Sequence, residues 1–176
     1  MDPFVPDNKL HWFVAYVLSC QERKAAEALK KLGVEYYLPI QQERHQWSDR
    51  VKIVERMVLP RMIFIRTTLA RRPQLLGEVR VLSNYMTKGG AFHPIIVPDE
   101  QMDTFRFMVE HSHERVEFVS GAIATGSRCL IVSGPLQGFE CEVVYMSGTS
   151  YAAVRIESVG AFVVQVPTDA IRVVVE

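Results

Sequence analysis

Three parts of the sequence contain residue types that support catalysis or metal binding, and none has the spacing that such chemistry needs. The segment Gly121-Ala-Ile-Ala-Thr-Gly126-Ser-Arg128 is close to a phosphate-binding loop, but it has no lysine and leads into a strand-like segment instead of a helix. His111 and His113, with Glu110 and Glu114 beside them, resemble a loose metal cluster, but their spacing fits no zinc pattern. Cys20 could serve as a nucleophile, but nothing places a histidine beside it. We therefore expect no catalytic residue, metal or cofactor, and predict that the protein is not an enzyme.

A basic segment that contains an aromatic residue points instead to nucleic acid. The stretch Arg44–Arg72 holds eight basic and two acidic residues, although the whole chain has a net charge of zero. Lysine and arginine neutralise phosphates, and a tryptophan stacks on an unpaired base. The predicted nucleic-acid-binding residues in this segment are Arg44, Trp47, Arg50 and Lys52. The alternative is a solvated hairpin with Trp47 packed into the core.

Four apolar residues form a second candidate surface. If the faces of the predicted strands and helix converge, Met62, Phe64, Tyr85 and Met102 could lie partly exposed together. Aromatic and methionine side chains dominate the energetics of protein interfaces, so such a patch would suit the helices of a partner. The alternative is that all four belong to the core, and the apolar strand around Phe64 favours that interpretation for this residue.

Composition places the chain among ordinary globular proteins. It has 176 residues, of which 48% are hydrophobic and 23% charged, so disorder is not its main state. No apolar stretch approaches the roughly 20 residues of a membrane span, and the N-terminus lacks a signal-peptide pattern. Three widely spaced cysteines form no CxxC pair and are expected to be small buried hydrophobes. A cytoplasmic protein without a membrane partner is expected.

The first part of the chain alternates strands with helices. Leu10–Leu18 is aromatic and β-branched, which predicts a strand, and alanines and leucines at three- and four-residue spacing predict a helix over Gln21–Leu32 that ends at Gly33. The remaining predicted elements are strands at Val34–Pro39, Val51–Leu59, Met62–Thr67 and Val81–Thr87, a short helix within Ala70–Arg80 that is broken by Pro73, a turn at Gly89-Gly90, and a helix at Asp99–His111. This pattern predicts an α+β domain with an antiparallel sheet flanked by helices.

The last part contains only strands and turns. The polar residues after His111 are interpreted as a linker over 112–122. The predicted strands are Arg128–Val132, Glu140–Met146, Ala152–Ile156, Ala161–Val166 and Ile171–Val175. Five short strands suggest a small closed barrel, because closure removes exposed edges. The predicted organisation is a first domain over 10–111, the linker, and an all-β domain over 123–176.

The order of these segments resembles a known family. Leu59-Pro-Arg-Met-Ile-Phe-Ile65 and Pro94-Ile-Ile-Val-Pro98, preceded by Trp12-Phe-Val-Ala-Tyr16, Gln21-Glu-Arg-Lys-Ala25 and Tyr37-Leu-Pro39, look like the N-terminal domain of NusG-type transcription elongation factors. The stretch Gly126–Glu140 looks like a KOW motif, which implies an SH3-like barrel. The segment Gln46–Arg50 is similar to the UpxY branch of specialised paralogues, which serve surface-polysaccharide operons.

The resemblance implies a transcription elongation or antitermination factor. The first domain of such factors docks through an apolar depression on the clamp helices of RNA polymerase and suppresses pausing or termination. It also faces the upstream DNA and the non-template strand. The KOW barrel of such factors binds a second protein, such as a ribosomal protein or Rho, and a monomer is expected.

Individual positions carry these implied roles. By position, Met62, Phe64, Tyr85 and Met102 match the polymerase-binding depression. The nucleic-acid face matches Arg23, Lys24, Lys31 and Arg80, and the KOW motif matches Gly126, Val132, Gly134, Pro135, Gly138 and Phe139. The chain departs from the family at Pro60, where Leu59 replaces an aromatic residue and Arg61-Met62 replaces a Gly-Tyr pair.

Two alternatives remain open at this point. KOW barrels also occur in ribosomal proteins, so the chain could be an RNA-binding or ribosome-associated KOW protein. An enzyme with an unrecognised site would need a deep pocket with perturbed ionisable groups.

Overall fold

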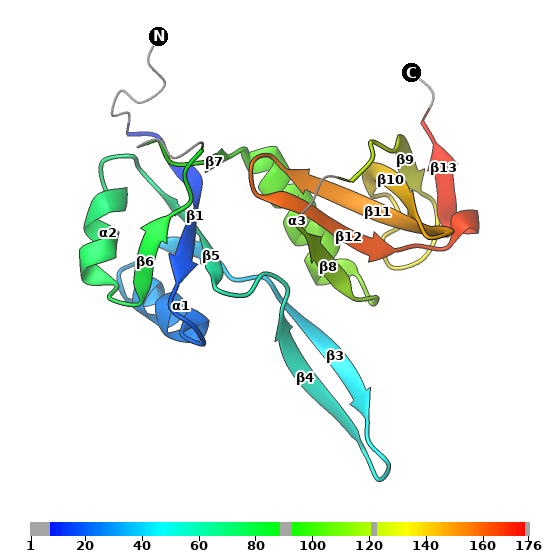
Figure 1. Ribbon diagram of the computed structural model, residues 1–176, viewed down its shortest axis with the longest axis horizontal. Coiled ribbons are helices and arrows are strands. Elements are labelled where there is room, and N and C mark those ends of the chain that lie inside the picture. Colours follow the sequence, from blue (N-terminus) through cyan, green and yellow to red (C-terminus); the bar gives the residue numbers. More distant parts are fainter. Residues whose placement is uncertain (1–7, 89–92, 121–122, 175–176) are drawn as a thin grey trace. The chain divides into compact units, whose positions relative to one another are not determined.

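The computed structural model describes residues 8–88, 93–120 and 123–174, which form two compact units (Figure 1). The first unit combines Met1–Pro39 with Leu59–Met102, and the second combines Ile40–Val58 with Asp103–Glu176. The expected α+β architecture followed by an all-β region is confirmed. No helix within the described ranges is long and apolar enough to cross a membrane.

The first unit is built on an antiparallel sheet with β1 (His11–Val17) at its centre. On one side β1 pairs with β5 (Met62–Thr67), which in turn pairs with β2 (Glu35–Tyr37). On the other side it pairs with β6 (Leu82–Tyr85) and with the short β7 (Ile96–Val97). The strand predicted at 10–18 is therefore the central strand, which pairs with three others of this sheet.

Two helices accompany this sheet. Helix α1 (Glu22–Lys31) has Glu22 in its first turn and lysines in its last turn, as the helix dipole favours, and Gly33 follows with a φ of 67°. Helix α2 (Arg72–Glu78) lies within the predicted range, but Pro73 does not break it, because Pro73 stands in the first turn, where a proline is tolerated. Apolar residues of both helices join one face of the sheet in a core that includes Phe13, Ala15, Ile63, Leu29 and Leu75.

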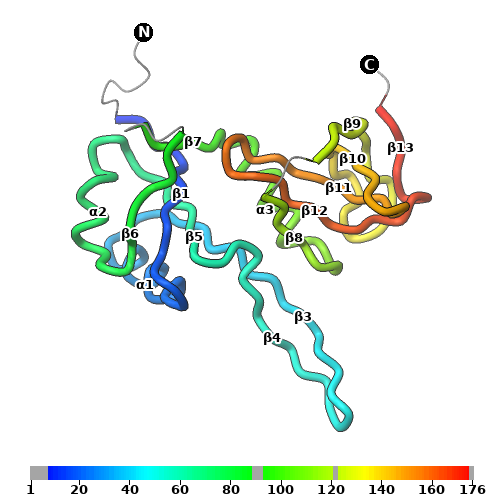
Figure 2. Tube along the Cα trace, viewed as in Figure 1, coloured from blue at the N-terminus to red at the C-terminus, as the bar shows by residue number. Residues whose placement is uncertain are grey.

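A long hairpin and most of one helix belong to the second unit. Strands β3 (Ile40–Gln46) and β4 (Val51–Met57) pair only with each other, and Figure 2 shows them as an extended two-stranded ribbon. Helix α3 (Asp99–His111) has its residues from Asp103 onward in this unit. The sequence predicted the second of these strands but not the first, because residues 40–46 are polar on both faces.

The rest of the second unit is an antiparallel sheet of six strands. They are β8 (Val116–Val119), β9 (Ser127–Ile131), β10 (Glu140–Met146), β11 (Thr149–Ile156), β12 (Gly160–Gln165) and β13 (Ile171–Val173), with a 3-10 turn at Thr168–Ala170. Their order is β13-β9-β10-β11-β12-β8. The segment interpreted as a linker over 112–122 thus contributes a strand, since β8 pairs with β12. The predicted Gly89-Gly90 turn lies outside the described residues.

Aromatic rings fill the core of the second unit. Phe162 of β12 is fully buried, and its ring centroid lies 4.0 Å from that of Phe105 on α3 and 5.2 Å from that of Phe118 on β8. The rings of Phe107 and Phe139 stack at 5.2 Å. These contacts connect α3 and β8 to the C-terminal strands through apolar packing.

We predict that Phe162→Ala lowers the free energy of unfolding of the second unit by about 3–5 kcal/mol, because it removes a fully buried ring that contacts two others. Urea titration followed by circular dichroism measures this loss. The matched control is Tyr145→Ala, since Tyr145 is 66% exposed on β10 and its removal should change stability by less than about 0.5 kcal/mol. Equal losses for the two variants would contradict this view of the core.

Candidate functional site

The four apolar residues predicted to form one surface do not lie on one face of the sheet. Strand register pairs Val14 with Phe64 and Tyr16 with Met62, whereas Tyr85 pairs with Ala15. Because side chains alternate along β1, Tyr85 lies on the face that the helices cover, and Phe64 and Met62 lie on the opposite face. The structure therefore separates Tyr85 from the other two strand residues.

Tyr85 is a core residue held by several contacts. Its hydroxyl donates a 3.1 Å hydrogen bond to the carbonyl of Arg72, and its ring makes an edge contact with Phe13 at 6.0 Å. The Arg72 guanidinium lies over both rings, at 5.3 and 5.6 Å. Burial raises the pKa of Tyr85 to about 12. Its contacts indicate a role in packing rather than in docking.

The other three apolar residues differ in exposure. Phe64 is fully buried, and its ring centroid lies 6.4 Å from that of Tyr37 on the neighbouring β2. Met102, in the first turn of α3, is fully buried as well, and its N–H donates to the carbonyl of Pro98 at 3.1 Å. Met62 is half-buried at the start of β5. Met62 is therefore the member of the set that has exposed surface in this structure.

Basic residues of the first unit lie on the outer side of α1 and beside β1. The helix buries Ala25, Ala26 and Leu29 against the sheet. This leaves its cations on the solvent side, where Arg23, Lys24 and Lys31 are exposed. Arg80 is exposed immediately before β6 begins. All four residues predicted to contact nucleic acid are therefore exposed.

The tip of the β3–β4 hairpin exposes its tryptophan. Trp47 is 56% exposed, and the Arg50 guanidinium lies 5.9 Å from the ring centroid. The Trp47 N–H donates to the carbonyl of Arg50 at 2.8 Å and closes the turn. Arg44 and Lys52 are exposed on the same hairpin. The alternative in which Trp47 packs into the core does not hold.

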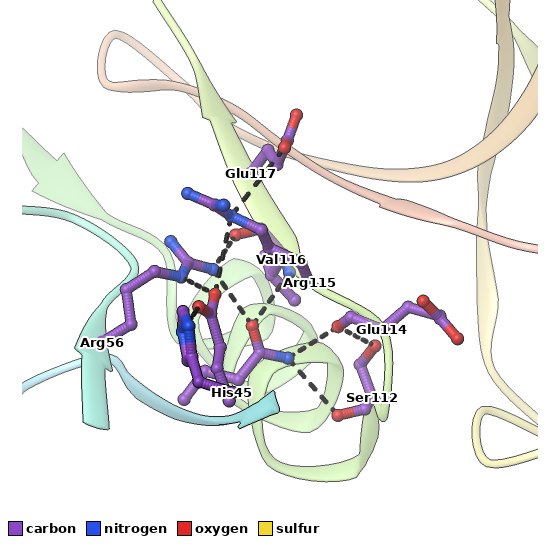
Figure 3. A network of polar contacts seen from close by, with 9 residues as sticks. His45, Arg56, Ser112, Glu114, Arg115, Val116 and Glu117 are labelled. Atoms are coloured by element: carbon purple, nitrogen blue, oxygen red, sulfur yellow. Dashed lines mark hydrogen bonds and ion pairs between the residues drawn. The ribbon is translucent and has the colours of Figure 1, made fainter. Parts of the chain in front are cut away.

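The base of the hairpin is held by a polar network that the sequence did not reveal (Figure 3). The Gln41 amide donates to the carbonyls of Ser112 and Glu114, at 3.3 and 2.7 Å. Its oxygen accepts the N–H of Val116 at 2.9 Å and a guanidinium N–H of Arg56 at 3.1 Å. Gln41 is only 5% exposed, so one amide binds the hairpin to the chain that leads into β8.

Arg56 and Glu43 extend this network. Arg56 donates to the carbonyl of Val116 at 2.6 Å and to the carboxylate of Glu43. Partial burial acts to raise the pKa of Glu43, but hydrogen bonds from Arg56 and His45 and the charges of Arg56 and Arg115 outweigh it, so the pKa is lowered. Glu43 therefore stays ionised and offsets part of the positive charge of the hairpin.

A groove of about 1030 Å³ lies between the hairpin and the residues around His113. Its lining includes Arg44, His45, His113 and Arg115, but also Glu43 and Glu110. Since charges of both signs line it, the groove has no field that would select a phosphate. No cluster of three potential metal ligands occurs within the described ranges.

The residues matched to the KOW motif have backbone roles. Gly134 and Gly138 adopt φ values of 85° and 84° in the loop between β9 and β10. Phe139 is buried, and its carbonyl accepts the N–H of Ile131 at 2.9 Å. A Cβ atom on Gly126 would lie 1.9 Å from the Val143 carbonyl oxygen, so only glycine fits there. Val132 is half-buried and Pro135 exposed.

Glu142 organises the start of this region. Its carboxylate accepts the Gly126 N–H and two hydrogen bonds from Arg155, at 2.6 and 2.9 Å. Arg155 also donates to the carbonyl of Ala124 at 3.0 Å. The hydrogen bond from Arg155 is the main cause that lowers the pKa of Glu142, and partial burial opposes it.

The three cysteines are free thiols. Cys129 and Cys141 are buried, as expected, whereas Cys20 is exposed.

Comparisons with known proteins agree with this architecture. A family model described as "Transcription termination factor nusG" matches residues 10–106. A solved structure, "Domain interaction in Thermotoga maritima NusG", is similar with a TM-score of 0.52 at 17% identity, over 94% of this chain and 98% of that chain. A chain of the MjSpt4:Spt5 complex covers 93% of this chain and 97% of that chain at 12% identity, with a TM-score of only 0.29. No curated protein matches the chain significantly.

We predict that Glu142→Gln lowers stability at neutral pH by about 1–2 kcal/mol, because it weakens charge-assisted hydrogen bonds. A lowered folded-state pKa means that the carboxylate stabilises the fold fully above its ordinary pKa of 4.5 and loses this contribution as the pH falls through the folded-state value. The variant should therefore show a weaker loss of thermal stability than the wild type below about pH 4.5. Calorimetry over a pH series measures both effects.

The control is Glu140→Gln, which removes only an exposed ion pair with Arg128 and should change stability by less than about 1 kcal/mol. If Glu142→Gln behaves like this control at every pH, the assigned role of Glu142 is incorrect.

Proposed function

This chain belongs to the NusG family of transcription factors, and from this premise we propose that it is a non-enzymatic elongation or antitermination factor that acts on RNA polymerase. The observation that carries the proposal is the family match over residues 10–106, which includes the whole sheet of the first unit. The extended hairpin and the β-rich C-terminal region are consistent with it. A cytoplasmic location and a surface-polysaccharide operon as the target belong to the same proposal.

Polymerase docking would use the sheet face that carries Met62 and Phe64, together with Met102. Burying a phenylalanine or methionine side chain contributes about 1.5–3 kcal/mol, so a few such anchors are enough for micromolar binding. Phe64 and Met102 can take part only when the groups that cover them move away, whereas Met62 is already partly exposed. Tyr85 would support this face from the opposite side of the sheet. The proposed contact on the polymerase is its pair of clamp helices.

Nucleic acid would be contacted at two places. On the first unit, Arg23, Lys24, Lys31 and Arg80 would neutralise phosphates of the upstream DNA. On the hairpin, Trp47 would stack on an unpaired base of the non-template strand while Arg44, Arg50 and Lys52 hold the backbone. The exposed ring and the adjacent guanidinium support the second contact.

The C-terminal region would act as a KOW domain and recruit a second protein. The loop that contains Gly134, Pro135 and Gly138 is exposed except at Leu136, so it is open to a partner. A ribosomal protein or Rho is the proposed partner, with the chain itself a monomer.

Transcription in vitro across a terminator tests the function. We predict that the wild-type chain raises read-through and that Met62→Glu reduces this effect at least tenfold, because a carboxylate placed in an apolar contact must be desolvated. The same variant should lose retention of RNA polymerase in a pull-down.

The control is Tyr145→Glu, which introduces the same charge at a residue that is 66% exposed on β10, outside the proposed polymerase and DNA contacts. It should leave read-through and retention unchanged. No read-through on any template would count against the elongation role, and binding of ribosomal RNA without polymerase would favour the ribosome-associated alternative.

We predict that Trp47→Ala weakens binding of single-stranded DNA by about 1–3 kcal/mol, roughly 5- to 150-fold, because a stacking platform is lost. Because these variants remove the one exposed tryptophan of the described chain (Trp12 is only 3% exposed), the affinity is measured by fluorescence anisotropy of a labelled single strand. Trp47→Phe keeps an aromatic ring and should retain most of the affinity. Unchanged binding by Trp47→Ala would remove the hairpin tip from the proposed interface.

A further inference from the structure

Arg61 adopts a backbone conformation that its side chain does not favour. Its φ is 64°, in the left-handed region, and it follows Pro60 directly before β5. A proline followed by a residue with positive φ is the pattern of a type II turn, whose second central position normally holds glycine or asparagine. An arginine there carries an energetic cost that glycine would not. Residues held in such conformations concentrate at functional sites.

The turn itself uses only the backbone of Arg61. Its N–H donates to the carboxylate of Glu22 at 2.9 Å, and its carbonyl accepts the N–H of Val17 at 2.8 Å. Glu22 is only 7% exposed, so this contact is firmly placed at the start of α1. Any residue could make these two hydrogen bonds. The folded structure therefore does not explain why position 61 carries a guanidinium.

The Arg61 side chain is directed to solvent. It is exposed, and within residues 8–88, 93–120 and 123–174 its guanidinium forms no hydrogen bond or ion pair. An unpaired, always charged group with a fork of donors is suited to bind a phosphate. The Glu22 carboxylate at this turn accepts the backbone N–H of Arg61.

Further cations gather at the same end of the sheet. Strands β5 and β6 are both antiparallel to β1 and flank it, so both start beside the end of β1. The N–H of Leu18 donates to the carbonyl of Val81 at 2.9 Å, which places Arg80 across β1 from Arg61, two strand spacings or roughly 10 Å away. In Figure 1 the arrowhead of β1 points towards α1.

Helix α1 adds two more cations to this end. Arg23 and Lys24 are exposed in its first turn, where the helix dipole disfavours positive charge. Cations from the turn before β5, from the start of β6 and from the first turn of α1 thus lie beside the last residues of β1. The helix dipole disfavours the two cations on α1, and the left-handed backbone conformation disfavours Arg61. Local rules are broken together in this way mainly where function requires it.

We propose that Arg61 completes a phosphate-binding surface with Arg23, Lys24 and Arg80, and that this surface holds the backbone of duplex DNA. The inference rests on the proposed function, which already assigns the other three residues to nucleic acid, and adds a residue that the family resemblance did not supply. Duplex is the favoured form because this surface presents cations from separate elements, whereas the stacking ring for single strands is Trp47 on the hairpin.

The test uses the full chain and the variant Arg61→Gly. Fluorescence anisotropy with a labelled duplex over a salt series should show binding about three- to tenfold weaker at moderate salt, with a log–log salt slope smaller by about one. The thermal unfolding midpoint should stay equal or rise, because glycine relieves the left-handed conformation. A single strand of equal length, bound through Trp47, should be affected less.

Two further variants sharpen the result. Ser158→Gly replaces another exposed residue with a positive φ, 65°, in the turn between β11 and β12, and should leave the affinity for duplex unchanged. Arg61→Lys keeps the charge and should restore part of the affinity.

The outcomes separate this inference from the proposed function. If Arg80→Ala weakens duplex binding and Arg61→Gly does not, Arg61 is not part of the surface and the proposed function stands. If Arg61→Gly lowers the unfolding midpoint together with the affinity, its role is structural and the inference fails. If the wild-type chain binds no duplex, both the inference and the DNA contact in the proposed function fail, whereas polymerase retention tests the rest.

Discussion

The alternation of side chains along β1 determines what the first unit can present to a partner. This strand is the centre of its sheet, and every residue from Trp12 to Ala15 is buried, so both faces are covered by apolar groups. Strand register extends the alternation to the neighbouring strands. Phe64 pairs with Val14 and lies on one face, whereas Tyr85 pairs with Ala15 and lies on the other. A change of register by one residue would exchange the two sets, so the fidelity of pairing at β1 controls the proposed docking face.

Local patterns predicted the elements that depend on local interactions. The β-branched stretch around Trp12 and the spacing of alanines before Gly33 were sufficient for β1 and α1, because strand preference and helix amphipathicity act over a few residues. The face of Tyr85 could not be predicted, since it depends on pairing between segments about 70 residues apart. The strand β8 did leave a signal: charged and apolar residues alternate with a period of two over Arg115, Val116, Glu117 and Phe118. Its mixed charges led to the interpretation as a linker.

The hairpin illustrates the same limit for polar contacts. Nothing near Gln41 in the sequence suggests that its amide satisfies backbone groups 71–75 residues away, although this makes it one of the few buried polar side chains. The network holds the base of a two-stranded ribbon that would be only marginally stable alone. Within the network Glu43 is paired with Arg56, whereas Arg44, Arg50 and Lys52 lie towards the tip together with Asp49. The cation that holds the base of the hairpin is thereby separate from the cations proposed to bind nucleic acid.

Two turns that contain residues with positive φ differ in how well the side chain suits the backbone conformation. Ser147 precedes Gly148 in the two-residue turn between β10 and β11, where positive φ at both positions suits the twist of the strands and small residues are expected. Arg61 adopts the same region with the longest of the side chains found there, although the turn is held by backbone groups and by Glu22. A sequence selected for stability alone would place glycine at this position. The arginine found at this position fits the proposed role of its charge at the end of β1.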